Sequence, residues 1–77
     1  MTRETIGRVQ IKAELAGNLW KVVVREGQPV QAEETLMILE SMKMEIPVTA
    51  PTAGIVREIR VKEQDVVQEG QVLAVIE

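Results

Sequence analysis

The chain has 77 residues, a net charge of −3, one aromatic residue (Trp20), and neither cysteine nor histidine. Without those two residue types there are no disulfides, no thiolate metal sites and no histidine base. Scattered basic residues argue against nucleic-acid binding, and no apolar run approaches the roughly 20 residues that span a bilayer. We therefore expect one monomeric, cytoplasmic domain over residues 1–77, with residues 1–8 as a flexible or edge N-terminal segment.

Short strand-like runs separated by turn residues fill the chain from residue 9 onward. Apolar and polar residues alternate in several of them, which gives each strand one buried and one exposed face. Glycine, proline and polar clusters break the runs, and helical spacing is not sustained anywhere. The predicted strands are 9–15, 19–24, a short piece at 30, 36–40, 46–50, 55–61, 66–67 and 72–76.

The two halves of the chain repeat each other at a constant offset of 37 residues. Nine of the 32 pairs between residues 9–40 and 46–77 are identical, and several others match in apolar character. A match sustained without gaps indicates two equivalent structural units. We therefore predict an all-β fold: a flattened antiparallel β-sandwich or barrel of about eight short strands, with an internal pseudo-twofold axis. Such an axis would place the junction of the halves and the chain ends at opposite poles.

That junction carries a lysine between two methionines, in Glu40-Ser41-Met42-Lys43-Met44-Glu45. A short polar break between two strand-like runs predicts a hairpin turn. At such a tip Lys43 is a candidate handle for a covalently attached group. The alternatives are a solvated turn lysine, methionines that fill gaps in the core, and Ser41 and Glu45 as residues that cap the turn.

These residues resemble the biotin attachment motif of biotinyl domains, which most often reads Glu-Ala-Met-Lys-Met. The resemblance covers roughly residues 9–77, and the string Ala16 to Trp20 is shared with small stand-alone biotin/lipoyl attachment proteins. Further matching pieces are Gly27, Val30, Ala50-Pro51, Gly54 and Gln64 to Val67.

The resemblance implies that a biotin protein ligase joins biotin to Lys43. Met42, Met44, Ser41, Glu40 and Glu45 would then serve ligase recognition. The modified lysine would carry CO2 from a biotin carboxylase to a carboxyltransferase, so the chain would be a carrier with no catalytic residues and no metal of its own.

Departures from the family pattern are few. Ser41 replaces the usual alanine, and Glu33 and Gln64 stand where members often have glycine, so the turn at Gln64 is expected to be strained or differently shaped. The segment from Arg25 to Pro29 is too short for the protruding thumb of some bacterial carrier subunits.

Two rival functions stay open. A lipoyl-type acyl carrier would use lipoate on the same lysine, although lipoyl motifs usually flank it with aspartate and with alanine or valine. An interaction module without a cofactor would need an exposed apolar patch. Trp20 is interpreted as a strand residue covering apolar surface, Glu33-Glu34 as a solvated loop, and Pro47 as an edge-strand residue.

Overall fold

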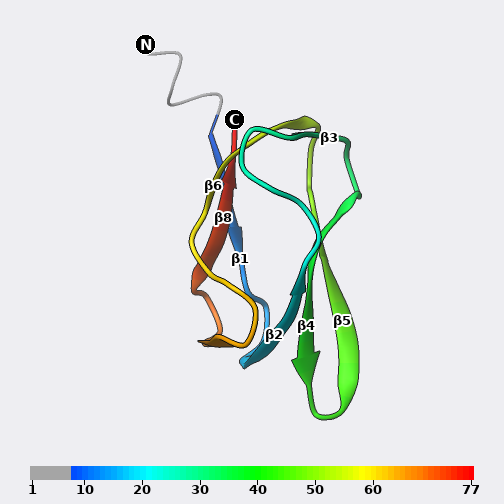
Figure 1. Cartoon of the computed structure of the whole chain (residues 1–77), viewed down its shortest axis with the longest axis vertical. Helices are drawn as coiled ribbons and strands as arrows, with labels where there is room; N and C mark the ends of the chain where they lie inside the picture. The colour runs from blue at the N-terminus through cyan, green and yellow to red at the C-terminus, as the bar shows by residue number, and fades with distance from the viewer. Residues whose placement is uncertain (1–7) are drawn as a thin grey trace.

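The structure, a computed structural model, describes residues 8–77 as eight β-strands in two layers (Figure 1). Most of the predicted N-terminal segment (1–8) lies outside the described residues. The strands are β1 (Val9–Lys12), β2 (Gly17–Val22), β3 (Pro29–Val30), β4 (Thr35–Ser41), β5 (Met44–Thr49), β6 (Gly54–Ile59), β7 (Val66–Val67) and β8 (Val72–Ile76).

The two layers are four-stranded antiparallel sheets, each built from both halves of the chain. One sheet has the order β1-β8-β6-β3 and the other β5-β4-β2-β7. Adding 37 to the residue numbers of β1 to β4 leads to β5 to β8, so the halves exchange strands symmetrically. Pro47 lies on the edge strand β5, as its missing amide donor predicted. The all-β sandwich with two equivalent halves is therefore confirmed.

Hydrogen bonds repeat at the same offset, which shows how closely the two halves match. The Gly27 amide donates to the Val56 carbonyl (2.7 Å), and its counterpart Gln64 donates to the Leu19 carbonyl (2.8 Å). Side chains follow the same rule in a second pair of contacts. Glu26 accepts from the Ile59 amide (2.9 Å), and Glu63 accepts from the Val22 amide (3.1 Å). Each half thus uses a glutamate at the equivalent position to tie its loop to the other half.

The core lies between the sheets and is entirely apolar among the described residues. Burying one such side chain stabilises the fold by roughly 1.5–3 kcal/mol. Its largest fully buried side chains are Leu19, Leu36, Met37, Leu39, Val56, Val67, Leu73 and Ile76. Both halves contribute to this set, so neither half covers its own apolar face.

Several strands end earlier than the alternation predicted. The first strand stops at Lys12 rather than at residue 15, because the Ala13 backbone bonds instead to the loop at Gly70 and Gln71. The second starts at Gly17, where it pairs with Val67, and stops at Val22 rather than at residue 24. Alternation marks inward-facing residues, and it does not report where ladder hydrogen bonds stop.

Backbone strain occurs at the positions where the family pattern has glycine. Glu33 (φ 70°) and Gln64 (φ 81°) are left-handed, and their repeat counterparts, Gly70 (φ 84°) and Gly27 (φ 89°), have the same conformation. A residue with a Cβ atom loses about 1–2 kcal/mol in this region. The predicted strain at the Gln64 turn is confirmed.

Candidate functional site at the tip of the β4–β5 hairpin

The junction of the halves is a tight two-residue turn between β4 and β5. Ser41 pairs with Met44, so only Met42 (φ 54°) and Lys43 (φ 67°) form the loop. Two positive φ values define a type I′ turn, which usually has Asn-Gly because those residues tolerate the conformation. Met-Lys here costs about 1–2 kcal/mol per residue. Strain of this kind persists at positions where function fixes the residue identity.

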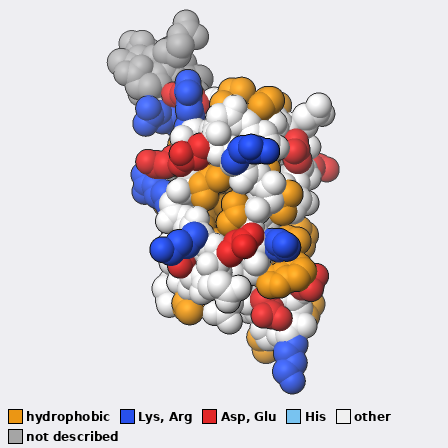
Figure 2. Space-filling view, in the orientation of Figure 1, with side chains coloured by type: hydrophobic (Ala, Val, Ile, Leu, Met, Phe, Trp, Pro, Cys, Tyr) orange, Lys and Arg blue, Asp and Glu red, His pale blue; other side chains and the backbone are white. Residues whose placement is uncertain are grey.

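The turn places Lys43 at the far end of the molecule. Lys43 is exposed, and the side chains beside it are 91% (Met42) and 63% (Met44) exposed, so the methionines do not fill gaps in the core. The hairpin tip and the C-terminus lie at opposite poles (Figure 1). Figure 2 shows the pole of the hairpin as a narrow projection that ends in basic side-chain atoms. Any enzyme can therefore approach the lysine from several directions.

The base of the turn is held by the loop that precedes β2. The Ser41 hydroxyl donates to the Ala16 carbonyl (3.0 Å). A Cβ atom on Gly17 would lie 2.5 Å from the Glu40 carbonyl oxygen and 3.2 Å from the Ser41 Cβ. Glycine at 17 and a small residue at 41 thus allow β2 and β4 to approach closely beneath the lysine. The sequence alone indicates a turn at Gly17 and does not reveal this close approach. The repeat counterpart Gly54 also lies close to neighbouring atoms, those of Ile76 and Glu77.

Two carboxylates flank the turn on the two arms of the hairpin. Glu40 lies directly opposite Glu45, and both side chains are exposed. Like charges in this position are mutually destabilising. Within residues 8–77, none of the ion pairs involves either residue. The part of the hairpin just below Lys43 therefore carries two carboxylates that no described ion pair neutralises.

At the opposite pole the matching carboxylate is neutralised. Glu77 is the repeat counterpart of Glu40, and the guanidinium groups of Arg57 and Arg8 both bond to its side chain. The hydrogen bond from Arg57, followed by that from Arg8, lowers the pKa of Glu77 below its ordinary value. The two poles share a backbone geometry and differ in charge.

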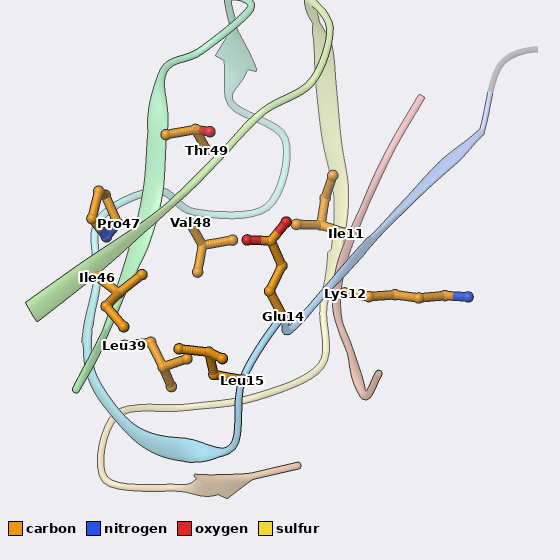
Figure 3. A pocket seen from close by; sticks show the side chains of 9 residues that line it. All are labelled: Ile11, Lys12, Glu14, Leu15, Leu39, Ile46, Pro47, Val48 and Thr49. Carbon is orange, nitrogen blue, oxygen red and sulfur yellow. The ribbon is translucent and has the colours of Figure 1, made fainter. Parts of the chain in front are cut away.

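A shallow groove of about 150 Å³ runs between β5 and the segment that follows β1. Figure 3 shows Leu15, Leu39 and Ile46 gathered at one end, with Glu14 turned toward Val48 and Lys12 pointing away. Pockets that hold small molecules usually measure about 300–1,000 Å³, so this groove is too small to enclose a cofactor. No helix in the described part of the chain could span a membrane. No group of acidic side chains within residues 8–77 is arranged to hold a metal ion.

Glu33 and Glu34 lie apart from this site. Glu33 is exposed, and the Glu34 carboxylate accepts a hydrogen bond from the Gln31 amide (2.9 Å). Their interpretation as a loop is confirmed. Trp20 lies on β2, as its interpretation as a strand residue predicted, and it is 42% exposed at an irregularity of the β2–β4 register.

Comparisons with known proteins agree with the fold. A family model described as "Biotin-requiring enzyme" matches residues 9–76. A biotin/lipoyl attachment protein of Bacillus subtilis is 51% identical over 63 residues, which are 82% of this chain and 86% of the relative. A biotinylated protein of Mycobacterium leprae, the TB7.3 homolog, is 47% identical over 66 residues, which are 86% of this chain and 93% of the relative.

Among solved structures, the urea carboxylase of Kluyveromyces lactis superposes with a TM-score of 0.87 at 36% identity. The match covers 91% of this chain and only 6% of that much longer enzyme. The likeness therefore concerns one domain of a carboxylase and not the whole enzyme. With a family model that spans nearly all described residues, and with relatives of similar length, this chain belongs to the biotin/lipoyl attachment domain family.

Proposed function

We propose that this chain is a biotin carboxyl carrier with biotin joined through an amide to the Nζ atom of Lys43. The observation that carries the proposal is the exposed lysine at a strained two-residue turn, at the pole opposite the C-terminus. The names of the relatives and the carboxylase in the structural match support the same cofactor.

The residues of the tip fit this group. A primary amine is the nucleophile that an amide link needs, and no ion pair within residues 8–77 engages Lys43. In the ligase, the deprotonated Nζ attacks the carbonyl carbon of biotinyl adenylate. The new N–C bond replaces the C–O bond to phosphate, AMP leaves, and a base of the ligase takes the amine proton. A stiff turn fixes the direction of attack, which lowers the entropic part of the barrier.

The rest of the chain contributes presentation. When bound, biotin supplies the ring nitrogen that carries CO2 from a biotin carboxylase to a carboxyltransferase. The sandwich keeps the tether clear of the body, and tethering raises the local concentration of the carried group at each enzyme. The Ser41 hydroxyl and Gly17 fix the base of the hairpin, so that the arm pivots at Lys43 and not lower down.

The ligase would recognise the residues immediately around the lysine. Met42 and Met44 offer two exposed apolar side chains at the turn, and Glu40 and Glu45 offer negative charge below it. The Ser41 hydroxyl holds the base of the turn in place by its hydrogen bond to the Ala16 carbonyl. These five residues surround Lys43 on the hairpin, which is where an enzyme must lie to reach its amine.

A second candidate cofactor is lipoate on the same lysine. The relative of Bacillus subtilis is named for both cofactors, and the fold suits either. The two methionines favour biotin, because lipoyl motifs usually have other residues beside the lysine.

Intact mass after co-expression tests both candidates. We expect the chain to gain the mass of one biotinyl group with a biotin protein ligase, and to gain no lipoyl group with a lipoate ligase. Lys43→Arg should abolish the adduct, whereas the control Lys12→Arg, which changes an exposed lysine of β1 in the other sheet, should keep it. An unmodified wild-type chain, or an adduct that survives Lys43→Arg, would contradict the proposal.

A further inference from the structure

The pseudo-twofold axis allows the outer faces of the two sheets to be compared position by position. On the sheet β1-β8-β6-β3, the outer face carries charged side chains that form ion pairs with one another. Arg8 and Arg57 bond to Glu77, and Arg60 bonds to Glu58. These side chains line an open depression together with Gln10 and Val75. Every charged group in these contacts has a partner within the same face.

The same positions on the other sheet have a different character. Subtracting or adding 37 converts Arg57 to Trp20, Arg60 to Val23, Gln10 to Pro47 and Val75 to Ile38. The charged positions differ as well, because the counterparts of Arg8, Glu77 and Glu58 are Glu45, Glu40 and Lys21. The apolar outer face, as we call it, therefore consists of Trp20, Val23, Ile38 and Pro47, together with the charged residues Lys21, Glu40 and Glu45 on the same side of the sheet.

Register places the hairpin residues of this set on one face, and exposure places Trp20 and Val23 outside the core. Ile38 lies opposite both Pro47 and Lys21, and Glu40 lies opposite Glu45. Residues directly opposite each other, or two apart on one strand, point to the same side of a sheet. Trp20 and Val23 are 42% and 54% exposed. An exposed tryptophan and valine where the other sheet has two arginines are not needed to hold the sandwich together.

Exposed apolar area bordered by charged residues is typical of a protein-binding surface. Tryptophan is among the residues that dominate binding energy at interfaces. Glu40 and Glu45 repel each other across the hairpin, and a cation from outside would remove that repulsion. The complementary surface is thus an apolar patch bordered by arginine or lysine.

We propose that the apolar outer face is the docking surface for the biotin protein ligase. This rests on the proposed function. The face continues along the β4–β5 hairpin to the two glutamates at the base of the turn. An unmodified lysine reaches only as far as its four-carbon stem, so the enzyme that acylates it must lie against the hairpin. The attached cofactor lengthens the arm, so enzymes that act later can work without this contact.

The test compares variants at positions related by the twofold axis, using a biotin protein ligase that modifies the wild-type chain. At limiting acceptor, Trp20→Ala should lower kcat/KM for biotinylation roughly 10- to 30-fold, mainly through KM. The matched control Arg57→Ala should stay within about twofold of wild type, because Arg57 lies on the other sheet. Prolonged incubation should still biotinylate both variants completely, since Lys43 is intact.

Charge gives an independent arm of the same test. Added salt should lower kcat/KM for the wild type and for Glu77→Gln, and should have a smaller effect on Glu40→Gln. Urea unfolding of each variant verifies that the fold is retained.

Three outcomes would overturn the docking proposal. One is a Trp20→Ala variant that matches wild type, and another is an equal loss in Trp20→Ala and Arg57→Ala. The third is a wild-type dimer in sedimentation that Trp20→Ala dissociates, which would assign the face to a second copy of the chain. Failure of the wild type to accept biotin at all would instead overturn the proposed function.

Discussion

Replacing Gly17 with alanine is expected to destabilise the domain and to disturb the turn that carries Lys43. The new Cβ atom would lie 2.5 Å from the Glu40 carbonyl oxygen, where ordinary Cβ contacts do not fall below 3.0 Å. Strand β2 must therefore move from β4 by at least about half an ångström. The obstructing atom belongs to the backbone of a paired strand, so no side-chain rotation can relieve the clash.

Overpacking of this kind costs typically 1–3 kcal/mol, and we expect about 2–3 kcal/mol for Gly17→Ala. For a domain of this size, each kcal/mol shifts Tm by about 4–8 °C, so Tm should fall by roughly 10–20 °C. Urea unfolding followed by circular dichroism and by Trp20 fluorescence measures the free energy directly. The denaturant slope should stay constant, because the unfolded chain is unchanged.

Two matched glycines separate the clash from other effects of alanine. Gly27 has a positive φ of 89° and no atom within 4 Å of the place where a Cβ would lie, so Gly27→Ala should cost only about 1–2 kcal/mol. Gly54→Ala meets the Ile76 side chain and the Glu77 carbonyl oxygen at the other pole. It should destabilise the fold without slowing modification of Lys43 in the folded fraction. A Gly17→Ala variant that is no less stable than Gly27→Ala would refute the reasoning.

Three further changes have definite expected results. Gln64→Gly should raise the unfolding free energy by about 0.5–1 kcal/mol in urea titrations, because relief of the left-handed strain exceeds the entropic cost of glycine; an equal or lower value would contradict the assigned strain. Because Arg57 and Arg8 lower the pKa of Glu77, its contribution is present above the ordinary glutamate pKa and is lost as pH falls through the lowered one. Stability–pH curves of the wild type and Glu77→Gln should therefore converge at low pH and separate toward neutrality, and parallel curves would contradict the two ion pairs. Leu73→Ala removes a fully buried side chain and should cost about 2–5 kcal/mol by the same titration, whereas a loss below about 1 kcal/mol would mean that the core is not packed as described.

The fold could be predicted because the local alternation of apolar and polar residues agreed with the repeat over the whole chain. Alternation in Val9, Ile11 and Ala13 marked an inward face, and the 37-residue repeat required a second copy of it. The order of strands in each sheet could not be derived, because a repeat does not say whether equivalent strands pair within a half or exchange. Strand ends were also missed, since Ala13 remains buried after its ladder has stopped.

The turn at Lys43 was predictable from the polar break between two runs, and its type was not. Met-Lys is unusual in a type I′ turn, so only the structure shows that both residues are left-handed. The opposed pair Glu40 and Glu45 depends on register, which one sequence leaves undetermined. The face around Trp20 became visible only through comparison of the two sheets, because a single tryptophan in a strand has no sequence signal for inward or outward orientation.

Strand exchange between the halves has a consequence for when the lysine becomes available during synthesis. The last strand, β8, lies between β1 and β6 and is the only strand among residues 8–77 that pairs with β1. The first strand therefore has no ladder until residues 72–76 have left the ribosome. An enzyme that requires the hairpin to be held by the closed sandwich would accordingly modify only chains that extend through these residues, although the sheet β5-β4-β2-β7 that contains the hairpin has all its strands by residue 67.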